Sequence, residues 1–374
     1  MKLKKIYEKF IFQESIKFLF FFILAIYCLF FILDFSLRGP KFFAIGTAEF
    51  SQFMLYYYYQ ISLYLNLFLS LGFLFAIIKV IGSMNRNNEL LALQMAGLSR
   101  QKIIRPLLLI GAFLSLLSYV NTEFQYPKAI RIVQNFKKQY LHSQRKEKNV
   151  NVQSIVLKDN TKLVYSHYDF VKNELKDVFW LLGNEIYHIK RLDLKKVPPQ
   201  GHFVDHFIQD NRSFFIKKNS YPLLNFKKIH FDKKSPAFLV PFEERAITTL
   251  VWQFFQKSYS SYKEKSALSA HLNYKLTLPL IPLLIPLLLT PWLFRFSRQS
   301  NYLFILTASA LFLFIGFYTL MDAFFILTEN GGSSSFVLLW MPFIILFGLA
   351  MLKQRFSENV LRFRYLLAHR LRTR

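Results

Sequence analysis

The stretch KFLFFFILAIYCLFFILDFSL, residues 17–37, holds one acidic residue, Asp34, in an almost continuous apolar run. A helix needs about 20 apolar residues to cross about 30 Å of hydrocarbon, so this run predicts a membrane-spanning helix. Five further stretches of similar character are residues 53–81, 103–120, 272–293, 302–327 and 336–352. We therefore expect six spans, three on each side of a charged central block.

The first span follows a basic segment, which is also typical of a cleaved signal peptide. However, its apolar run is long, and DFSLRGP at its end, residues 34–40, contains no small-x-small cleavage site. We interpret the first span as an uncleaved anchor.

Basic residues are segregated along the chain, in which 48 Lys and Arg stand against 22 Asp and Glu. With the N-terminus in the cytoplasm, the inner segments carry 18 basic residues, whereas the outer loops 38–52 and 328–335 carry 2. These inner segments are residues 1–17, 83–105, 294–301 and 353–374. The positive-inside rule therefore predicts cytoplasmic termini and an outer central block, because long domains cross regardless of their charge. The spread of the charge argues against nucleic-acid binding, although the net charge is +26.

The outer block, residues 121–270, changes at residue 151 to short β-rich runs. SIVLKDNTKLVYSHYDF, residues 154–170, predicts two strands joined by a tight turn at Asp159-Asn160. Many short strands at even spacing favour a sandwich, a jellyroll or a partly open barrel. Residues 246–257 have a helical pattern and predict a return segment. The one cysteine, Cys28, lies in the first span, so no disulfide can form within the chain.

Motifs for catalysis are absent from the sequence. It contains no Walker A, H-E-x-x-H, G-x-S-x-G or dinucleotide-binding pattern, so we expect no ATPase site, no catalytic residues, no metal and no cofactor. His202 and His206 would form a metal site on a helix, but on a strand they stand about 13 Å apart. Ser260 and Lys263 match S-x-x-K, but the partner motifs are missing.

Several charged residues lie close to the membrane. Arg38, Lys41 and Lys275 fall at the outer ends of spans, where they either snorkel to headgroups or contact an anionic ligand group. Lys79, near the cytoplasmic end of the second span, is interpreted as snorkelling. Asp322 in the fifth span would pair with a base or face a polar cavity.

The fourth span contains four prolines, which predict a kinked helix that either packs in a bent form or moves as a gate. They are Pro279, Pro282, Pro286 and Pro291.

The cytoplasmic loop NNELLALQMAGLSRQKIIRP, residues 87–106, predicts a short helix over about 88–98. Asn87 or Asn88 would cap its start, Gly97 would end it, and Ser99 would cap the next helix. One predicted stripe consists of Leu91, Met95 and Leu98, and a neighbouring small face consists of Ala92 and Ala96. Such a helix either packs on lipid and the spans, or docks a soluble partner with Glu89 as a charged contact.

The order of three spans, an outer β-rich domain and three spans resembles the LptF/LptG (YjgP/YjgQ) permeases of the lipopolysaccharide-export ABC transporter. The loop is similar to the family pattern N-E-x-x-A-x-x-x-A-G-x-S followed by a proline. YDFVKNELKDVFWL, residues 168–181, and YKLTLPLIPLLIPLLLTP, residues 274–291, also resemble family segments. The matching loop positions are Glu89, Ala92, Ala96, Gly97, Ser99 and Pro106.

The resemblance implies a bacterial inner-membrane permease half that works with a second six-span paralogue. A cytoplasmic ATPase dimer would dock on the loop helix, and lipopolysaccharide would pass into the outer β-jellyroll. A single-span jellyroll partner and a periplasmic jellyroll bridge would follow. The implied ATPase-coupling residues are Glu89, Leu91, Ala92, Met95, Ala96 and Gly97. Arg38, Lys41 and Lys275 would contact the lipid phosphates.

The resulting domain prediction has four parts. Residues 1–120 hold three spans with the coupling helix, and residues 121–270 form the periplasmic β domain with its helical return. Residues 271–352 hold three spans, and residues 353–374 form a basic cytoplasmic tail. The alternatives are a membrane sensor or scaffold with an outer β domain, and a lipid-modifying enzyme, for which no convincing His, Asp or Glu cluster is found. The residues do not distinguish between the two paralogues.

Overall fold

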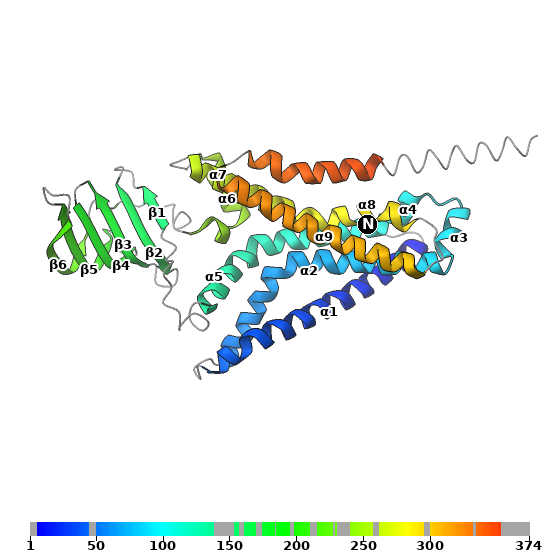
Figure 1. Ribbon diagram of the computed structural model, residues 1–374, viewed down its shortest axis with the longest axis horizontal. Coiled ribbons are helices and arrows are strands. Elements are labelled where there is room, and N and C mark those ends of the chain that lie inside the picture. The colour runs from blue at the N-terminus through cyan, green and yellow to red at the C-terminus, as the bar shows by residue number, and fades with distance from the viewer. Residues whose placement is uncertain are drawn as a thin grey trace, which may run out of the picture. The chain divides into compact units, whose positions relative to one another are not determined.

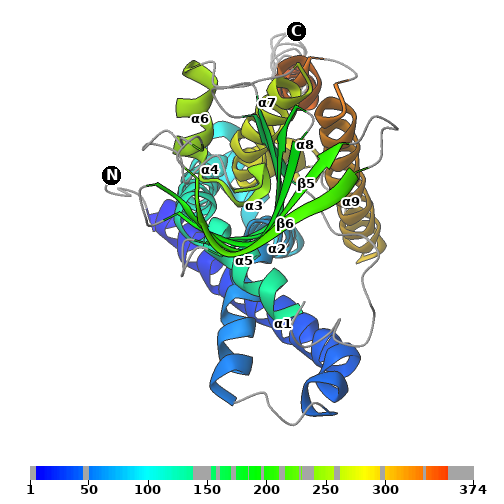
Figure 2. The same ribbon diagram turned by 90° about the vertical axis from the view of Figure 1, so that its left-hand side faces the viewer.

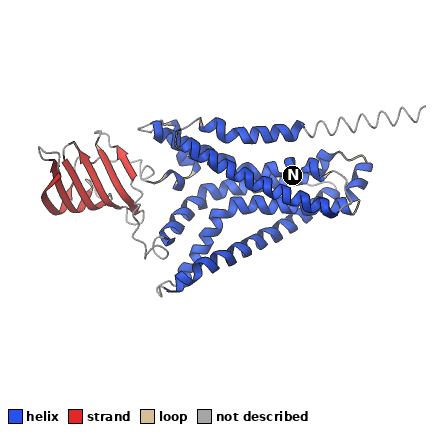
Figure 3. Ribbon diagram, in the orientation of Figure 1, coloured by secondary structure: helices blue, strands red, loops and turns tan. Residues whose placement is uncertain are grey.

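A computed structural model gives the architecture of the chain (Figures 1 and 3). The structure describes residues 6–44, 50–137, 153–156, 161–169, 174–183, 185–194, 198–209, 215–226, 229, 240–256, 262–294, 300–331 and 334–352. It divides into a helical unit, residues 1–141 with 242–374, and a β unit, residues 142–241.

The helical unit confirms six spans of sufficient length and apolarity to cross a membrane. They are Ile6–Pro40, Ser51–Arg86, Arg100–Phe136, Glu264–Leu293, Leu303–Glu329 and Ser335–Leu352. Their helices are α1 (Ile6–Ala44), α2 (Phe50–Arg86), α4 (Arg100–Val120), α5 (Tyr126–Phe136), α7 (Tyr262–Thr277), α8 (Ile281–Leu293) and α9 (Ser300–Glu329). The sixth span, Ser335–Leu352, follows α9.

The third and fourth spans are longer than expected. A π-helical turn, η1 (Asn121–Gln125), joins α4 to α5, so the helix continues to Phe136 without a break. At the other side of the β unit, α7 already begins at Tyr262. The β unit, residues 142–241, is therefore narrower than the predicted 121–270, because polar helical turns extend both spans beyond their apolar runs.

Buried side-chain hydrogen bonds hold the second span to the π-helical turn. Ser62 Oγ donates to Asn121 Oδ1 at 2.8 Å, and Asn66 Nδ2 donates to Thr122 Oγ1 at 3.0 Å. Asn121 Nδ2 in turn donates to the Ser62 carbonyl at 3.0 Å. Unpaired polar groups are costly in an apolar surrounding, so this network favours one relative position of α2 and η1.

The prolines of the fourth span are accommodated by a local change of helix type. Residues Leu278–Leu280 form a 3₁₀ turn, η5, directly before Ile281 and Pro282. This turn lies where Pro282 removes a backbone donor from the α-helical ladder. The predicted irregularity is present as a tightened turn between α7 and α8.

The apolar core of the helical unit lies between α2, α4 and α8, where Phe73, Ile103 and Leu107 are fully buried. In contrast, only 6% of the residues in the most apolar 18-residue stretch of the first span are buried within the chain, whereas 56% are buried in the second span. Most side chains in this part of the first span therefore face lipid or another protein, whereas Ile11 and Leu19 pack in the core.

The β unit is a single curved antiparallel sheet in which every strand pairs with its neighbour in sequence (Figure 2). Its strands are β1 (Gln153–Val156), β2 (Lys162–Asp169), β3 (Glu174–Leu182), β4 (Glu185–Asp193), β5 (Gln200–Gln209) and β6 (Phe215–Asn225). The all-β insertion is confirmed, while the described strands form one meander and not the two facing sheets of a sandwich. The Asp159-Asn160 turn lies outside the described residues.

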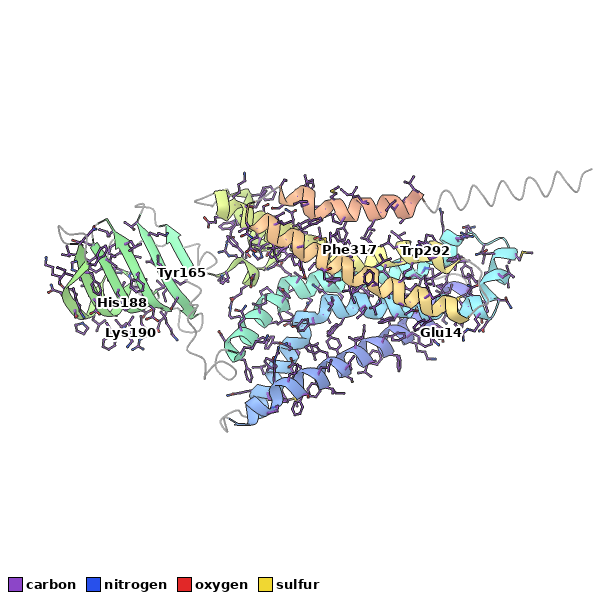
Figure 4. All side chains as sticks on the ribbon, viewed as in Figure 1. Glu14, Tyr165, His188, Lys190, Trp292 and Phe317 are labelled. Carbon is purple, nitrogen blue, oxygen red and sulfur yellow. The ribbon has the colours of Figure 1, made fainter. Side chains whose placement is uncertain are left out.

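Among the described residues of the sheet, one face carries the buried side chains and the other carries exposed and half-buried ones. Val178, Ile189 and Val204 are opposite one another and fully or almost fully buried, together with Trp180 and Phe226. His188 and Lys190 flank Ile189 in β4 and therefore point to the opposite face (Figure 4).

Replacing Ile189 by Ala should destabilise the β unit, because it removes a fully buried side chain from the centre of the sheet. The expected loss is about 2–5 kcal/mol of unfolding free energy. Pulse proteolysis of the full-length protein in urea, with fragments identified by mass spectrometry, measures it. The control Ile216→Ala, exposed on β6, should lose less than about 0.5 kcal/mol. Equal losses in the two variants would contradict this assignment of the core.

Candidate functional site

The loop between the second and third spans contains a short helix, α3 (Glu89–Met95). Its start differs from the prediction, because neither Asn88 nor Ser99 makes a side-chain cap hydrogen bond. Asn88 instead has a left-handed backbone with φ 59°, and Asn87 Nδ2 donates to Glu89 Oε1 at 3.1 Å. The turn is thus made by the backbone of Asn88, and the amide of Asn87 positions the first carboxylate of the helix.

α3 ends at Met95, just before Gly97, the residue that was predicted to end it. Gly97 has φ 81°, its N–H donates to the Gln94 carbonyl at 3.0 Å, and the Leu98 N–H donates to the Leu93 carbonyl at 3.1 Å. These two bonds satisfy the last carbonyls of the helix, and a side chain would be strained at this φ.

The burial of the side chains on α3 does not follow the predicted stripe of Leu91, Met95 and Leu98. Leu90 is fully buried in the core of the helical unit, and Leu93 and Leu98 pack against that core. Leu91 is 39% exposed and Met95 is 82% exposed, so Leu91 and Met95 do not share a buried side with Leu98. Ala92 and Ala96 are also exposed. We call Leu91, Ala92, Met95 and Ala96 the α3 face.

An open groove of about 760 Å³ lies beside the α3 face. Ile6 and Phe10 of α1 line one side, and Glu89 and Ala92 of α3 line the other. Glu89 is half-buried at its edge. The arrangement offers an apolar, small-residue surface next to a single carboxylate.

The cations at the outer ends of the spans are placed differently from one another. Arg38 pairs with Asp34 at 2.6 Å and donates to the Tyr56 hydroxyl at 2.7 Å, so its charge is balanced within the chain. Lys41 lies in α1, but its side chain is outside the described residues.

Lys275 is buried, with 6% exposure, and is engaged by the backbone of the chain that returns from the β unit. Its ammonium donates to the carbonyls of Glu243 at 2.7 Å, Arg245 at 2.6 Å and Phe242 at 3.4 Å. Phe242 and Glu243 belong to a 3₁₀ turn, η4 (Phe242–Glu244). The three donors of the ammonium are thus directed to protein carbonyls and not to a ligand.

Further polar contacts fasten the same return segment, which we define as residues 242–253. Glu244 pairs with Arg131 of α5 at 3.2 Å, and the Thr248 N–H donates to Glu123 of η1 at 3.2 Å. Within the segment, Arg245 donates to Gln253 at 2.7 Å. The sequence indicated this cluster only through Lys275, a lone cation in an apolar run.

The remaining candidates do not form a catalytic or metal site among the described residues. Asp322, for which a base or a polar cavity was expected, accepts a hydrogen bond from the Tyr274 hydroxyl. His206 on β5 lies 3.3 Å from Glu185 and stacks on Tyr187. In the described part of the chain, no three His, Cys, Asp or Glu side chains are grouped closely enough to hold a metal ion. Ser260 lies outside that part, as does the side chain of Lys263.

Comparison with known proteins gives one family. The family model described as lipopolysaccharide export system permease LptF/LptG matches residues 9–354. This range includes all six spans, α3 and the β unit, apart from three residues at the start of the first span. No curated protein matches the chain.

Replacing Leu90 by Ala should loosen α3 without affecting the spans, since it removes the one fully buried anchor of a seven-residue helix. A loss of about 2 kcal/mol or more corresponds to at least a tenfold rise in amide exchange over α3. Hydrogen–deuterium exchange of the purified protein measures this. Leu91→Ala, its exposed neighbour, should leave the exchange within about twofold. The same rise in both variants would show that Leu90 is not the anchor.

Replacing Lys275 by Met should release the return segment, because three carbonyls lose their donor while the side-chain length is kept. The cost of such unsatisfied groups is about 1–3 kcal/mol. Limited proteolysis should then cut faster within residues 242–256, whereas Lys102→Met, an exposed control, should be cut like the parent protein. Unchanged cleavage in Lys275→Met would argue against a fastening role.

Proposed function

Because the chain belongs to the LptF/LptG family of lipopolysaccharide export system permeases, we propose that it forms one half of the membrane part of an ABC transporter that extracts lipopolysaccharide. Family membership and the six spans make it a multi-pass inner-membrane protein with a transport role. A second, paralogous six-span subunit forms the other half. Its proposed position is against α1 and α9. Only 6% and 17% of the residues in the most apolar stretches of these two spans are buried within this chain, so both spans have surface left for a partner.

The proposed orientation places both termini and α3 in the cytoplasm. Its support is the distribution of Lys and Arg, with 18 on the inner segments and 2 on the outer loops. The β unit then lies in the periplasm.

The observation that carries the proposal is the α3 face. A transporter subunit without a Walker A sequence must receive work from a separate ATPase. The α3 face is exposed and apolar, and its Ala92 and Ala96 are small. Leu90 anchors α3 to the helical core, so force on the face reaches the spans. We propose that a cytoplasmic ATPase dimer docks here, with Glu89 and the backbone at Gly97 at the edges of the contact.

The β unit is the proposed acceptor of the extracted lipid. β1 and β6 are the edges of the described sheet, and an edge strand can pair with a strand of another protein. A single-span jellyroll partner and a periplasmic jellyroll bridge would continue the path from such an edge. At the membrane, Lys41 and Arg38 remain the proposed phosphate contacts, with Arg38 already paired to Asp34. The carbonyl contacts of Lys275 favour a fastening role instead.

Replacing both Ala92 and Ala96 by Phe should abolish docking of the ATPase, because bulk on the α3 face prevents close approach. The variant should insert normally and lose at least about tenfold of the co-purifying ATPase, the change expected for about 1.4 kcal/mol. Affinity purification in mild detergent, with protein identification by mass spectrometry, gives the readout.

Lys218→Phe adds the same kind of bulk to exposed β6 and serves as the control. Full ATPase recovery with the Ala92 and Ala96 variant would reject docking on the α3 face. Absence of any ATPase or second six-span subunit from the parent preparation would favour the sensor or scaffold alternative.

A further inference from the structure

A second groove, of about 500 Å³, lies between α1, α2 and α9 and combines cationic with apolar walls. Lys79, Ser83 and Arg86 line it from α2, and Thr307 lines it from α9. Phe22 of α1, Phe75 of α2 and Phe304 of α9 are among its apolar walls. Among the described residues, its lining contains no Asp or Glu.

The three polar residues that line the groove from α2 form a row along one side of the helix. Lys79, Ser83 and Arg86 are four and three residues apart, which places them on one face. Lys79 and Arg86 are about 10 Å apart along the helix axis at 1.5 Å per residue. All three are exposed in the chain. Two long cationic side chains with a hydroxyl between them can converge on one phosphate group.

The wall opposite this row depends on a close helix approach. A Cβ atom at Gly82 would lie 2.8 Å from Leu303 Cδ2, so a larger residue there would displace the end of the Leu303 side chain of α9. The Thr307 hydroxyl donates to the Leu303 carbonyl at 2.7 Å. On the α1 side, Lys79 Nζ lies 5.7 Å from the ring centroid of Phe18. The groove is thus bounded by packed side chains of three helices, and a cation that only snorkels needs no such hollow.

We propose that this groove binds an anionic phospholipid of the membrane leaflet in which α2 ends. The phosphate lies between Lys79 and Arg86, with Ser83 donating to one of its oxygens. An acyl chain lies along Phe22, Phe75 and Phe304. With the orientation given under the proposed function, this is the cytoplasmic leaflet, so the ligand is a resident lipid and not the exported one.

The site lies directly before α3, which gives the lipid a position next to the coupling helix. The Asn87 N–H donates to the Ser83 carbonyl at 3.0 Å, so the turn into α3 continues from the residue that would contact the phosphate. A bound lipid therefore stabilises the last turn of α2.

The test uses the full-length protein in nanodiscs of phosphatidylcholine with a small share of photoactivatable phosphatidylglycerol in both leaflets. Because both leaflets carry the probe, the outcome does not depend on the orientation of the protein. Cross-linked peptides are mapped by mass spectrometry. We expect capture on peptides containing Phe22, Phe75 or Phe304, reduced at least about tenfold in the double variant Lys79→Gln with Arg86→Gln.

Three comparisons make the result decisive. Lys79→Arg with Arg86→Lys keeps both charges and should retain capture, as should Lys102→Gln, which removes an exposed cation that does not line the groove. Ser83→Trp keeps the charges but fills the groove and should reduce capture. Unchanged capture in the Gln double variant, equal capture of a phosphatidylcholine probe, or preferential competition by lipopolysaccharide would each overturn the proposal.

The same preparations separate this inference from the proposed function. If the Gln double variant loses lipid capture at the groove but co-purifies with the ATPase normally, the lipid site is supported independently of the docking site. If the groove instead cross-links to an acidic segment of a second permease subunit and excludes the lipid probe, the lipid assignment is rejected while the transport role stands.

Discussion

The burial of one ammonium group fixes where the return segment meets the fourth span. Lys275 lies inside the fourth span, where an unpaired charge is expensive, and the carbonyls of Phe242, Glu243 and Arg245 surround it. Those carbonyls belong to the chain returning from the β unit. The start of the fourth span and the end of the insertion are therefore held at one point, with Glu244 and Glu123 adding contacts to the third span.

At the opposite end of the helices, α3 shows how a very short helix is held in place by its surroundings. Seven residues are too few for a helix that is stable in isolation. Leu90 in the core, the left-handed turn at Asn88 and the bonds after Gly97 supply what the length does not. These contacts fix the position of the α3 face on the helical core, as the proposed docking of an ATPase requires.

Sequence patterns predicted long elements well and local phase poorly. Hydropathy located six spans because each apolar run is near the length that a bilayer requires. The pattern grouped Leu91, Met95 and Leu98 but did not identify Leu90 as the buried residue, since in seven residues a shift of one position exchanges Leu90 for Leu91 with little change in pattern. The partners of Lys275 could not be predicted, because they are backbone carbonyls about 30 residues away. Every residue has a backbone carbonyl, so the residue types there give no signal. The predicted insertion, residues 121–270, was wider than the β unit for a related reason. Polar helical turns at the ends of the third and fourth spans carry no apolar signal.

The order of the strands has a consequence for how the chain assembles. Because β1 to β6 pair strictly in sequence, all pairings in the sheet are between near neighbours along the chain. Low contact order favours rapid formation, and chains are synthesised from the N-terminus. The sheet can therefore form as soon as its last strand emerges, before the fourth span has been made. The inner strands β2 to β5 are then paired on both sides before the later helices are made, and β1 and β6 remain as the edges of the described sheet.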